Sequence, residues 1–309
     1  MKQKDRELKK AVKGAEGFDA YYAALYGARW EKLKSSLAKE PLFVKVEYPS
    51  CEPYFMDAAS ICAALALPMP KEDVGGGTAK ILDLCAAPGG KSLVIAGNMG
   101  GNAVLYSNER SPDRKKRLDT VLCASLPSDI CKNIVTSCSD GATWCKKEES
   151  CFSAILLDAP CSSERHVLSD AKYLAQWSPS RIKSLASEQW ALLSSAWRLL
   201  SPASYMVYST CALADDENDG VIERLIKKFP QAAVAGNEEV LAAFESNIQS
   251  FHGGLFTETE SADGIATTSA VSVIRECFAN AEKTRFGRHI MPDSANGAGP
   301  IYFTVLKKE

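Results

Sequence analysis

Two cysteines each end a short apolar run, which places a reactive side chain at the end of a predicted strand. Cys161 ends the run AILLDAPC, and Cys211 ends the run YMVYSTC. Both runs have the length and the residue types of strands buried on both faces, as in a parallel sheet. Because ligands bind outside the carboxyl ends of the strands in open α/β sheets, we expect both thiols to face one crevice. Two thiols beside a nucleotide-like ligand indicate covalent chemistry on a planar electrophile.

A glycine-containing turn follows a third predicted strand and could cradle that ligand. The strand Ile81–Cys85 leads into a turn made of Cys85, Ala86, Ala87, Pro88, Gly89, Gly90 and Lys91. Glycine lets a backbone approach a ligand closely, and the helix that follows presents free N–H groups to a carboxylate or phosphate. The spacing matches neither the dinucleotide-binding fingerprint nor a P-loop. The turn therefore predicts a ligand site without identifying its type.

Acidic residues stand at or just after the ends of three further predicted strands. Glu109 ends the strand 103–109 and could accept hydrogen bonds from ribose hydroxyls, as acidic residues do in dinucleotide folds. Asp140 follows the strand 132–137 and could meet an adenine amino group, and Asp158 could steer an electrophilic base toward Cys161. Singly, each carboxylate could instead cap a helix. Together with the turn, they predict an adenosine-containing cofactor.

Strands and helices alternate from Lys80 onward, which predicts a doubly wound, mostly parallel α/β sheet. The predicted strands are 80–84, 103–109, 132–137, 154–159 and 204–210, and the predicted helices are 90–98, 112–124, 179–200 and 216–229. We expect a mainly helical N-terminal region at 1–74 and a second domain at 75–309. Spacings of three and four between apolar residues predict one amphipathic helix over 18–37. Residues 231–298 give no clear prediction.

The composition is that of a soluble globular protein and excludes several classes. The chain has 309 residues, 46% of them hydrophobic and 24% charged. No apolar stretch reaches the roughly 20 residues of a membrane helix, and the start lacks the apolar core of a signal peptide. We therefore expect a cytoplasmic protein that does not bind membranes; a mitochondrial location stays open. The 11 cysteines are an odd number and include no Cys-x-x-Cys pair, so we expect neither a disulfide framework nor a metal site.

Four motifs, in this order, resemble the Nop/Sun (Fmu-like) family of RNA cytosine-5 methyltransferases. The motifs are YFMDAAS at Tyr54–Ser60, LDLCAAPGGK at Leu82–Lys91, DAPCS at Asp158–Ser162, and STC at Ser209–Cys211 followed by Glu217 and Asn218. The resemblance extends from about Tyr54 to Lys308. It implies a class I methyltransferase fold, Rossmann-like, at 75–309.

The resemblance also assigns roles to residues. It implies S-adenosyl-L-methionine as cofactor, bound by the turn Cys85–Lys91 and by Glu109, Asp140 and Asp158, with help from Arg114. It makes Cys211 the nucleophile and Cys161 the thiol associated with product release. Carbon 5 of cytosine is a poor nucleophile until a thiolate adds to carbon 6, so covalent catalysis explains why such an enzyme needs a cysteine. The target base must leave its stack to reach both thiols.

Two departures from the family pattern indicate a subgroup. The family commonly has glycine after Pro-Cys-Ser, where this chain has Ser163, and commonly ends with Gly-Phe-Phe, where this chain has GPIYF at 299–303. Both departures resemble the compact enzymes that act on mitochondrial ribosomal and transfer RNA, and their bacterial relatives. We expect ribosomal RNA as the substrate; transfer RNA and a non-catalytic role in ribosome assembly stay open.

The RNA is expected to bind through local basic patches, because the net charge is only −2. Candidate phosphate contacts around the crevice are Lys91, Arg165 and Arg288. No appended RNA-binding module is recognisable, so a targeting protein or a ribosomal subunit could select the target. We expect the protein to be a monomer.

Overall fold

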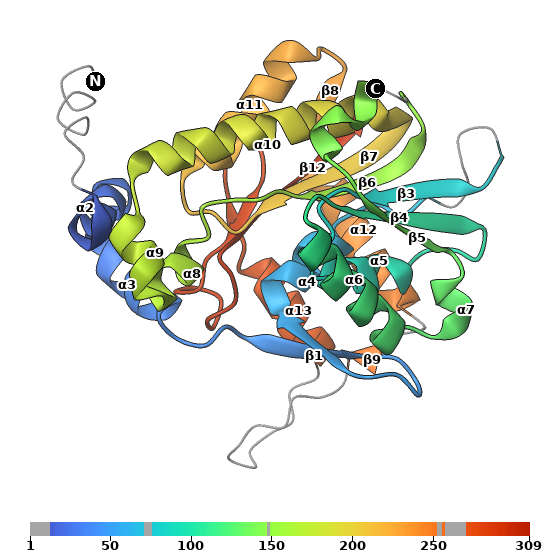
Figure 1. The fold of residues 1–309 in the computed structure, drawn as a ribbon, viewed down its shortest axis with the longest axis horizontal. Coiled ribbons are helices and arrows are strands. Elements are labelled where there is room, and N and C mark those ends of the chain that lie inside the picture. The colour runs from blue at the N-terminus through green and yellow to red at the C-terminus, as the bar shows by residue number, and fades with distance from the viewer. Residues whose placement is uncertain (1–12, 71–75, 147–148, 252–254, 257–269) are drawn as a thin grey trace.

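The computed structural model describes residues 13–70, 76–146, 149–251, 255–256 and 270–309, and its centre is a nine-stranded sheet (Figure 1). Five strands pair in parallel in the order β7-β6-β3-β4-β5. They are β3 (Ala79–Asp83), β4 (Ala103–Glu109), β5 (Ile134–Cys138), β6 (Phe152–Asp158) and β7 (Leu200–Thr210). Each overlaps its predicted strand, so the mostly parallel α/β class is confirmed.

Antiparallel strands extend the sheet beyond β7. The strand β12 (Ile301–Lys308) pairs with β7, and its other edge carries two short pairings. The strands on that edge are β8 (Ala232–Val234) and the hairpin of β10 (Glu282–Lys283) and β11 (Arg288–Ile290). The sheet is therefore mixed at one side only.

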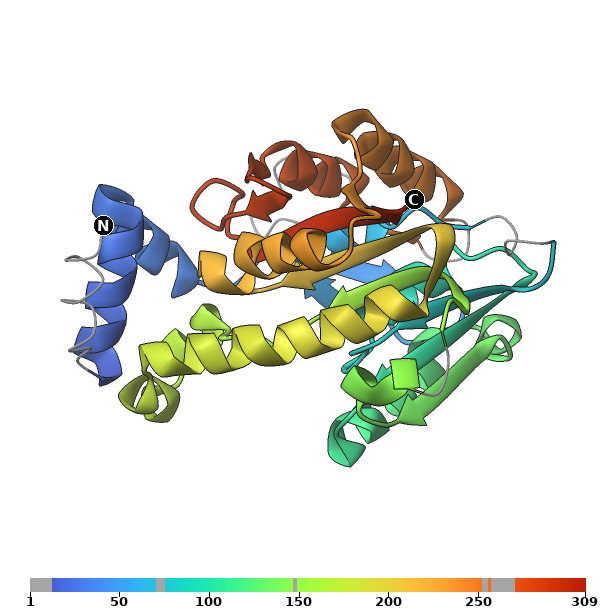
Figure 2. The same cartoon turned by 90° about the horizontal axis from the view of Figure 1, so that it is seen from above.

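Helices cover both faces of the sheet (Figure 2). They are α5 (Gly90–Ala96), α6 (Pro112–Ser125), α7 (Ser128–Cys131), α10 (Pro179–Leu199), α11 (Asp219–Lys228), α12 (Asn237–Ser250) and α13 (Ala270–Ala279). Side chains of a strand alternate between faces, so Leu156 and Val207 join one core while Ile155 and Met206 join the other. Two separate apolar cores explain why these strands read as continuous apolar runs.

The segment 18–37 is not one helix, as the apolar spacing predicted. It forms α2 (Gly14–Tyr26), a short 3-10 turn η1 (Gly27–Arg29) and α3 (Trp30–Leu37). Gly27 has a φ of 56°, a left-handed conformation that ends α2. The aromatic side chains still share one side, because Phe18, Tyr22 and Trp30 are buried together with Trp177.

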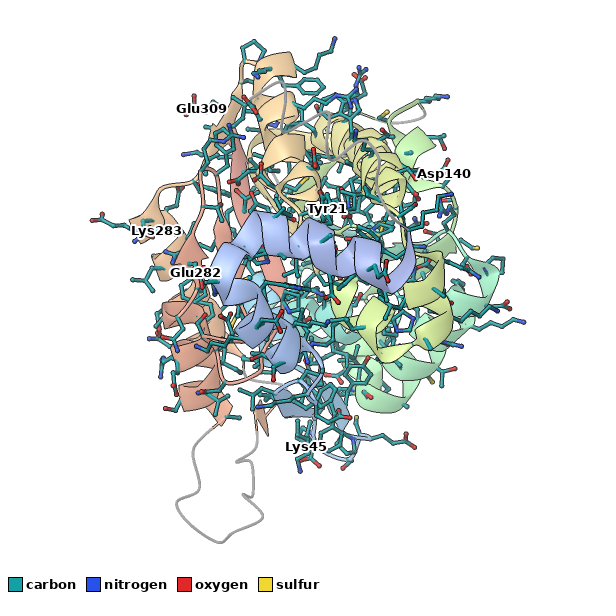
Figure 3. The ribbon with its side chains drawn as sticks, turned by 90° about the vertical axis from the view of Figure 1, so that its left-hand side faces the viewer. Tyr21, Lys45, Asp140, Glu282, Lys283 and Glu309 are labelled. Atoms are coloured by element: carbon teal, nitrogen blue, oxygen red, sulfur yellow. The ribbon has the colours of Figure 1, made fainter. Side chains whose placement is uncertain are left out.

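The helix α2 lies across one end of the molecule (Figure 3) and contacts the loops that follow β6 and β7. The Tyr22 hydroxyl donates a hydrogen bond to Glu164, just after the Cys161 turn. The Tyr26 hydroxyl donates to the Leu213 carbonyl, just after Cys211, at 2.8 Å. The loops on this side are built around short elements: α8 (Glu164–Ser169), α9 (Ala171–Gln176) and the 3-10 turn η3 (Asp215–Glu217). The N-terminal helix therefore braces both cysteine-bearing loops.

The rest of the N-terminal region joins the main core. The strands β1 (Phe43–Glu47) and β2 (Tyr54–Asp57) form a small sheet with β9 (Leu255–Phe256), and α4 (Ala58–Leu65) follows. Buried residues of α4 share one core with α5 and α13. The predicted domain boundary at 74 falls within 71–75, outside the described residues, and stays a prediction. No helix in the described part of the chain is both long enough and apolar enough to span a membrane.

Candidate active site

The two cysteines predicted to face one crevice lie in contact. Asp158 and Ser209 are paired neighbours at the ends of β6 and β7, and each thiol follows within a few residues. The Sγ atoms of Cys161 and Cys211 are 3.0 Å apart, and the Cys211 N–H donates to the Cys161 Sγ at 3.3 Å. The structure therefore brings together both thiols at the carboxyl edge of the parallel strands.

The contact between the two sulfurs limits the negative charge that the pair can carry. The hydrogen bond with Cys211, followed by burial, raises the pKa of the Cys161 thiol well above its ordinary value. Cys161 therefore stays a neutral thiol at pH 7, whereas nucleophilic attack requires a thiolate. A negative charge on one sulfur disfavours a second charge 3.0 Å away. The geometry therefore favours at most one thiolate at a time.

The loop after Cys161 contains a contact that the sequence did not reveal. Ser163 has a φ of 56°, and its Oγ lies 3.2 Å from the Cys211 Sγ and 3.5 Å from the Cys161 Sγ. Its neighbours are held by buried carboxylates: the Ser162 N–H donates to Glu217 at 2.9 Å, and the Ser162 hydroxyl bonds Glu164. The hydroxyl of Ser163 is thus fixed beside both thiols. The one sequence signal was the departure from the family's glycine.

Asp158 and Lys91 form an ion pair beside the thiols. The Lys91 Nζ lies 2.7 Å from Asp158 Oδ2, and the Ser209 hydroxyl donates to Asp158 Oδ1 at 2.8 Å. Burial opposes the charge of Lys91, but Asp158 more than offsets it and leaves the pKa of Lys91 raised. Lys91 was predicted to contact the cofactor or an RNA phosphate. Its ammonium group pairs with Asp158 and neutralises that carboxylate. Lys91 also lines the pocket of the glycine turn, and its contact with a cofactor or a phosphate stays a prediction.

The turn Cys85–Lys91 lines a pocket together with Asp158. Gly89 has a φ of 123°, which residues with a Cβ rarely adopt, and a Cβ on Gly90 would lie 2.8 Å from the Tyr54 ring. The backbone conformation therefore favours glycine at position 89, and the close approach of the Tyr54 side chain favours it at position 90.

A buried carboxylate that the sequence analysis did not select, Asp83, also lines this pocket. Its Oδ2 accepts from the Ser92 hydroxyl at 2.7 Å, while its Oδ1 has no hydrogen-bond partner among the described residues. Burial raises the pKa of Asp83 to about 7. The sequence did contain a signal for this residue, because Asp83 is a carboxylate at the end of an apolar strand, between Leu82 and Leu84.

A second pocket is lined by Cys85, Glu109, Arg114 and Asp140 among others, and shares Cys85 with the first. Glu109 is buried, and its Oε1 accepts a hydrogen bond from the Ser111 N–H at 2.9 Å. Its Oε2 lies 3.3 Å from Arg114 Nη1 but receives no hydrogen bond among the described residues. An acceptor left free in a pocket suits a hydroxyl donor such as ribose.

The remaining two predicted residues of this pocket, Arg114 and Asp140, form hydrogen bonds with the protein backbone. Arg114 donates to the Ala87 carbonyl at 2.7 Å and so anchors the glycine turn. Asp140 is exposed and accepts from the Ala142 N–H at 3.1 Å, which is the capping role that the sequence left open. Its place in the lining still leaves it near any bound ligand. The pair of pockets therefore fits an adenosine-containing molecule.

Arg165 does not point to a free surface, contrary to the expectation that it binds phosphate. Its guanidinium donates to the carbonyl oxygens of Gly299 at 2.6 Å and Gly297 at 2.8 Å, and also to that of Lys39. A guanidinium carries five donors, and here the loops around it use them. Arg165 therefore joins three segments of the fold.

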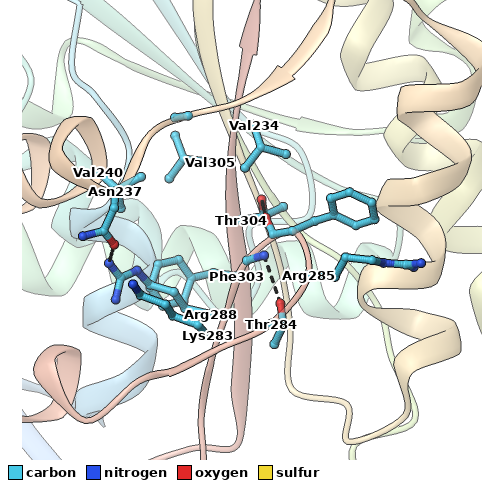
Figure 4. Close-up of a pocket in the computed structure, with 13 residues that line it drawn as sticks. Val234, Asn237, Val240, Lys283, Thr284, Arg285, Arg288, Phe303, Thr304 and Val305 are labelled. Atoms are coloured by element: carbon cyan, nitrogen blue, oxygen red, sulfur yellow. Dashed lines mark hydrogen bonds between the residues drawn. The ribbon is translucent and has the colours of Figure 1, made fainter.

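Arg288 lies at a different pocket on the outer edge of β12 (Figure 4), which shares no lining residue with the two pockets above. Its guanidinium bonds the Asn237 side chain and lies 5.0 Å over the Phe278 ring. Lys283 and Arg285 line the same pocket, and no acidic residue does. The structure thus separates Arg288 from the thiols but places it in a basic pocket.

Comparisons with known proteins agree with this geometry. A family model described as 16S rRNA methyltransferase RsmB/F matches residues 70–267. Ribosomal RNA small subunit methyltransferase F of Erwinia tasmaniensis is 37% identical over 179 residues, 58% of this chain and 36% of that protein. The Klebsiella pneumoniae protein of that name is 36% identical over 196 residues, 62% of this chain and 39% of its own length. The aligned segments thus span less than half of these relatives.

Solved structures of low sequence identity share the fold. A methyltransferase homolog protein from Pyrococcus horikoshii has a TM-score of 0.62 at 19% identity, and the match covers 93% of each chain. NSun6 from the same organism has a TM-score of 0.55 at 19% identity, covering 83% of this chain and 53% of that one. The architecture is therefore that of class I, Rossmann-like methyltransferases.

Proposed function

Because the chain belongs to the 16S rRNA methyltransferase RsmB/F family, we propose that it methylates carbon 5 of a cytosine in ribosomal RNA, with S-adenosyl-L-methionine as methyl donor. The observation that carries the proposal is the contact of two thiols, 3.0 Å apart, beside the glycine turn at the carboxyl edge of the sheet. A reaction that needs one covalent attack and one later release explains why both are present.

The two adjoining pockets would hold the cofactor. The glycine turn would lie along it, and Asp140 would lie near the adenine. The Oε2 of Glu109, which receives no hydrogen bond among the described residues, would accept from a ribose hydroxyl. When bound, S-adenosyl-L-methionine supplies an electrophilic methyl group. Arg114 would support cofactor binding indirectly, because its hydrogen bond to the Ala87 carbonyl holds the glycine turn in place.

The residues around the two thiols would each take a different step of the reaction. The Cys211 thiolate adds to carbon 6 of the base, while Asp158, held by Lys91 and Ser209, hydrogen-bonds the ring. Carbon 5 then accepts the methyl group. Elimination then restores the aromatic ring: the carbon 5 proton passes to solvent, the electrons of its bond form the carbon 5–carbon 6 double bond, and Cys211 leaves as a thiolate. Cys161 acts in that release, and its neutral state beforehand keeps a second negative charge away from the attacking sulfur.

The choice of RNA is the least constrained part of the proposal. The curated relatives are named for the small ribosomal subunit, and this chain aligns with 36–39% of the two described above. We therefore propose ribosomal RNA as substrate, with a ribosomal subunit or a targeting protein as a second source of recognition. The expected monomeric state and cytoplasmic location stay predictions.

Bisulfite sequencing of total RNA, from cells with and without the gene for this chain, tests the proposal. We expect a protected cytosine in small-subunit ribosomal RNA that becomes convertible when the gene is deleted and stays convertible when Cys211→Ala is supplied instead. A change confined to transfer RNA would replace the substrate class. No change in any RNA would favour the non-catalytic role in ribosome assembly.

A further inference from the structure

Ser163 occupies a backbone conformation that its residue type disfavours. Its φ of 56° is left-handed, where a Cβ crowds the backbone, and the residue opens the short helix α8 without a side-chain cap to its N–H groups. Glycine would fit this position without strain. A residue that accepts such strain beside a reactive site is a candidate for a functional role.

The hydroxyl of Ser163 reaches three acceptors. It lies 3.2 Å from the Cys211 Sγ, 3.5 Å from the Cys161 Sγ and 3.3 Å from the Cys161 carbonyl. A serine hydroxyl has one proton, so it donates to one of them at a time. A thiolate is a charged acceptor and forms a stronger hydrogen bond than a neutral thiol or a carbonyl. The proton of Ser163 is therefore expected to follow the negative charge between the two sulfurs.

We propose that Ser163 is a positioning residue that donates its hydroxyl proton to whichever of the two sulfurs carries the negative charge. This inference rests on the proposed function and deepens it. Before attack, the hydroxyl donates to the Cys211 thiolate and stabilises it. Once Cys211 is bonded to carbon 6, its sulfur is neutral, and the hydroxyl becomes available to Cys161. No proton or electron is transferred by Ser163 itself.

Other groups also act on the two thiols but would be unchanged by substitution of Ser163. Lys91 from α5 interacts with Cys211, and Glu217 from η3 and Tyr208 from β7 interact with Cys161. Asp158 at the end of β6 acts through its ion pair with Lys91. Because the contacts of these groups do not pass through the Ser163 hydroxyl, a change in the pH midpoint of Cys211 alkylation on its removal reports that hydroxyl.

The test compares Ser163→Gly with Ser163→Ala. Both remove the hydroxyl, but glycine relieves the left-handed strain and alanine keeps it. The rate of alkylation of Cys211 by iodoacetamide is followed against pH, with peptide mass spectrometry to separate Cys211 from the other cysteines. We expect the midpoint to rise by about one pH unit in both variants, the size of one charge-assisted hydrogen bond. Ser169→Ala, an exposed serine at the end of α8, is the matched control and should leave it unchanged.

The outcomes separate a hydroxyl role from a backbone role. Unchanged midpoints in both variants overturn the proposal. A midpoint that is raised in Ser163→Ala but unchanged in Ser163→Gly also overturns it, because the effect would then come from backbone strain and not from the hydroxyl. A second measurement is the single-turnover methylation rate, which should fall about tenfold below the midpoint and recover at high pH. Alkylation needs neither RNA nor cofactor. A shifted midpoint in a protein that methylates no RNA would therefore refute the proposed function and leave the role of Ser163 standing.

Discussion

Glu109 has a buried carboxylate oxygen whose place in the pocket supports the proposal that it contacts the cofactor. Its Oε1 is satisfied by a backbone N–H, but its buried Oε2 receives no hydrogen bond among the described residues. Glu109→Ala should weaken S-adenosyl-L-methionine by about 1–3 kcal/mol, the cost of losing a hydrogen bond to a charged group. Calorimetric titration measures this, with the exposed Asp113→Ala as the control that should not change affinity. If Glu109→Ala and the wild type bind S-adenosyl-L-methionine equally tightly, Glu109 does not contact the cofactor.

Asp83 predicts a pH dependence of stability. Burial raises its pKa to about 7 in the folded chain, against 3.8 ordinarily, so the folded state holds a proton that the unfolded state has lost between these values. The contribution of Asp83 to the free energy of unfolding therefore falls as pH rises from about 4 to about 7. Asp83→Asn imitates the protonated form, so it should be more stabilising at pH 7.5 than at pH 5. Urea unfolding at both pH values checks this, and an identical effect at both would contradict the assignment.

The positions of the candidate site residues were predictable from sequence only where the path of the backbone determines them. The ends of adjacent parallel strands meet at one edge, so Cys161 and Cys211 could be placed together without a structure. Arg165 could not be placed, because a long side chain near a crevice can satisfy loop carbonyls as readily as phosphates. The contact of Ser163 with both sulfurs depends on one left-handed loop residue, which no periodicity reports.

The hairpin β10–β11 is the element that supplies the basic pocket on the outer edge of β12 (Figure 4). Arg285 is engaged by Glu223 at 3.1 Å, whereas the exposed Lys283 makes no side-chain hydrogen bond or ion pair in the described structure. If RNA phosphate lies here, Lys283→Ala should reduce the slope of log affinity against log salt by about 1. Filter binding at several salt concentrations measures the slope. The control is Lys80→Ala at the amino end of β3, and equal slopes for both variants would exclude this pocket from the RNA path.

Helices and strands with a regular spacing of apolar residues were predicted closely, but breaks within them were not. The strand 103–109 was predicted to the residue, since its ends are marked by loop and helix residues. The segment 18–37 keeps one apolar side through its break, so its period suggested a continuous helix, although Gly27 turns left-handed. Residues 231–298 gave no clear strand pattern because their described strands, β8, β9, β10 and β11, are only two or three residues long, and the helices α12 and α13 in this range were not predicted.

The whole molecule combines two adjacent thiols at the carboxyl edge of its parallel strands with a weak overall charge. Its net charge of −2 cannot supply the long-range attraction that most nucleic-acid-binding proteins use. If the chain binds RNA as proposed, recognition would come from local basic groups, from the shape of the crevice, or from a surface presented with the RNA. The fold class followed from strand and helix alternation alone, whereas the RNA target is a property of surfaces that alternation does not describe.

The central claim is that Cys211 attacks the base and Cys161 acts on release, and covalent trapping tests it most directly. Each variant is incubated with unmodified substrate RNA and S-adenosyl-L-methionine, and protein–RNA adducts are resolved under denaturing conditions. Cys161→Ala should accumulate an adduct that carries the methyl group, whereas Cys211→Ala should form none. Cys123→Ala, which removes an exposed thiol, should turn over like the wild type. Adducts in Cys211→Ala and none in Cys161→Ala would reverse the two roles and contradict the account.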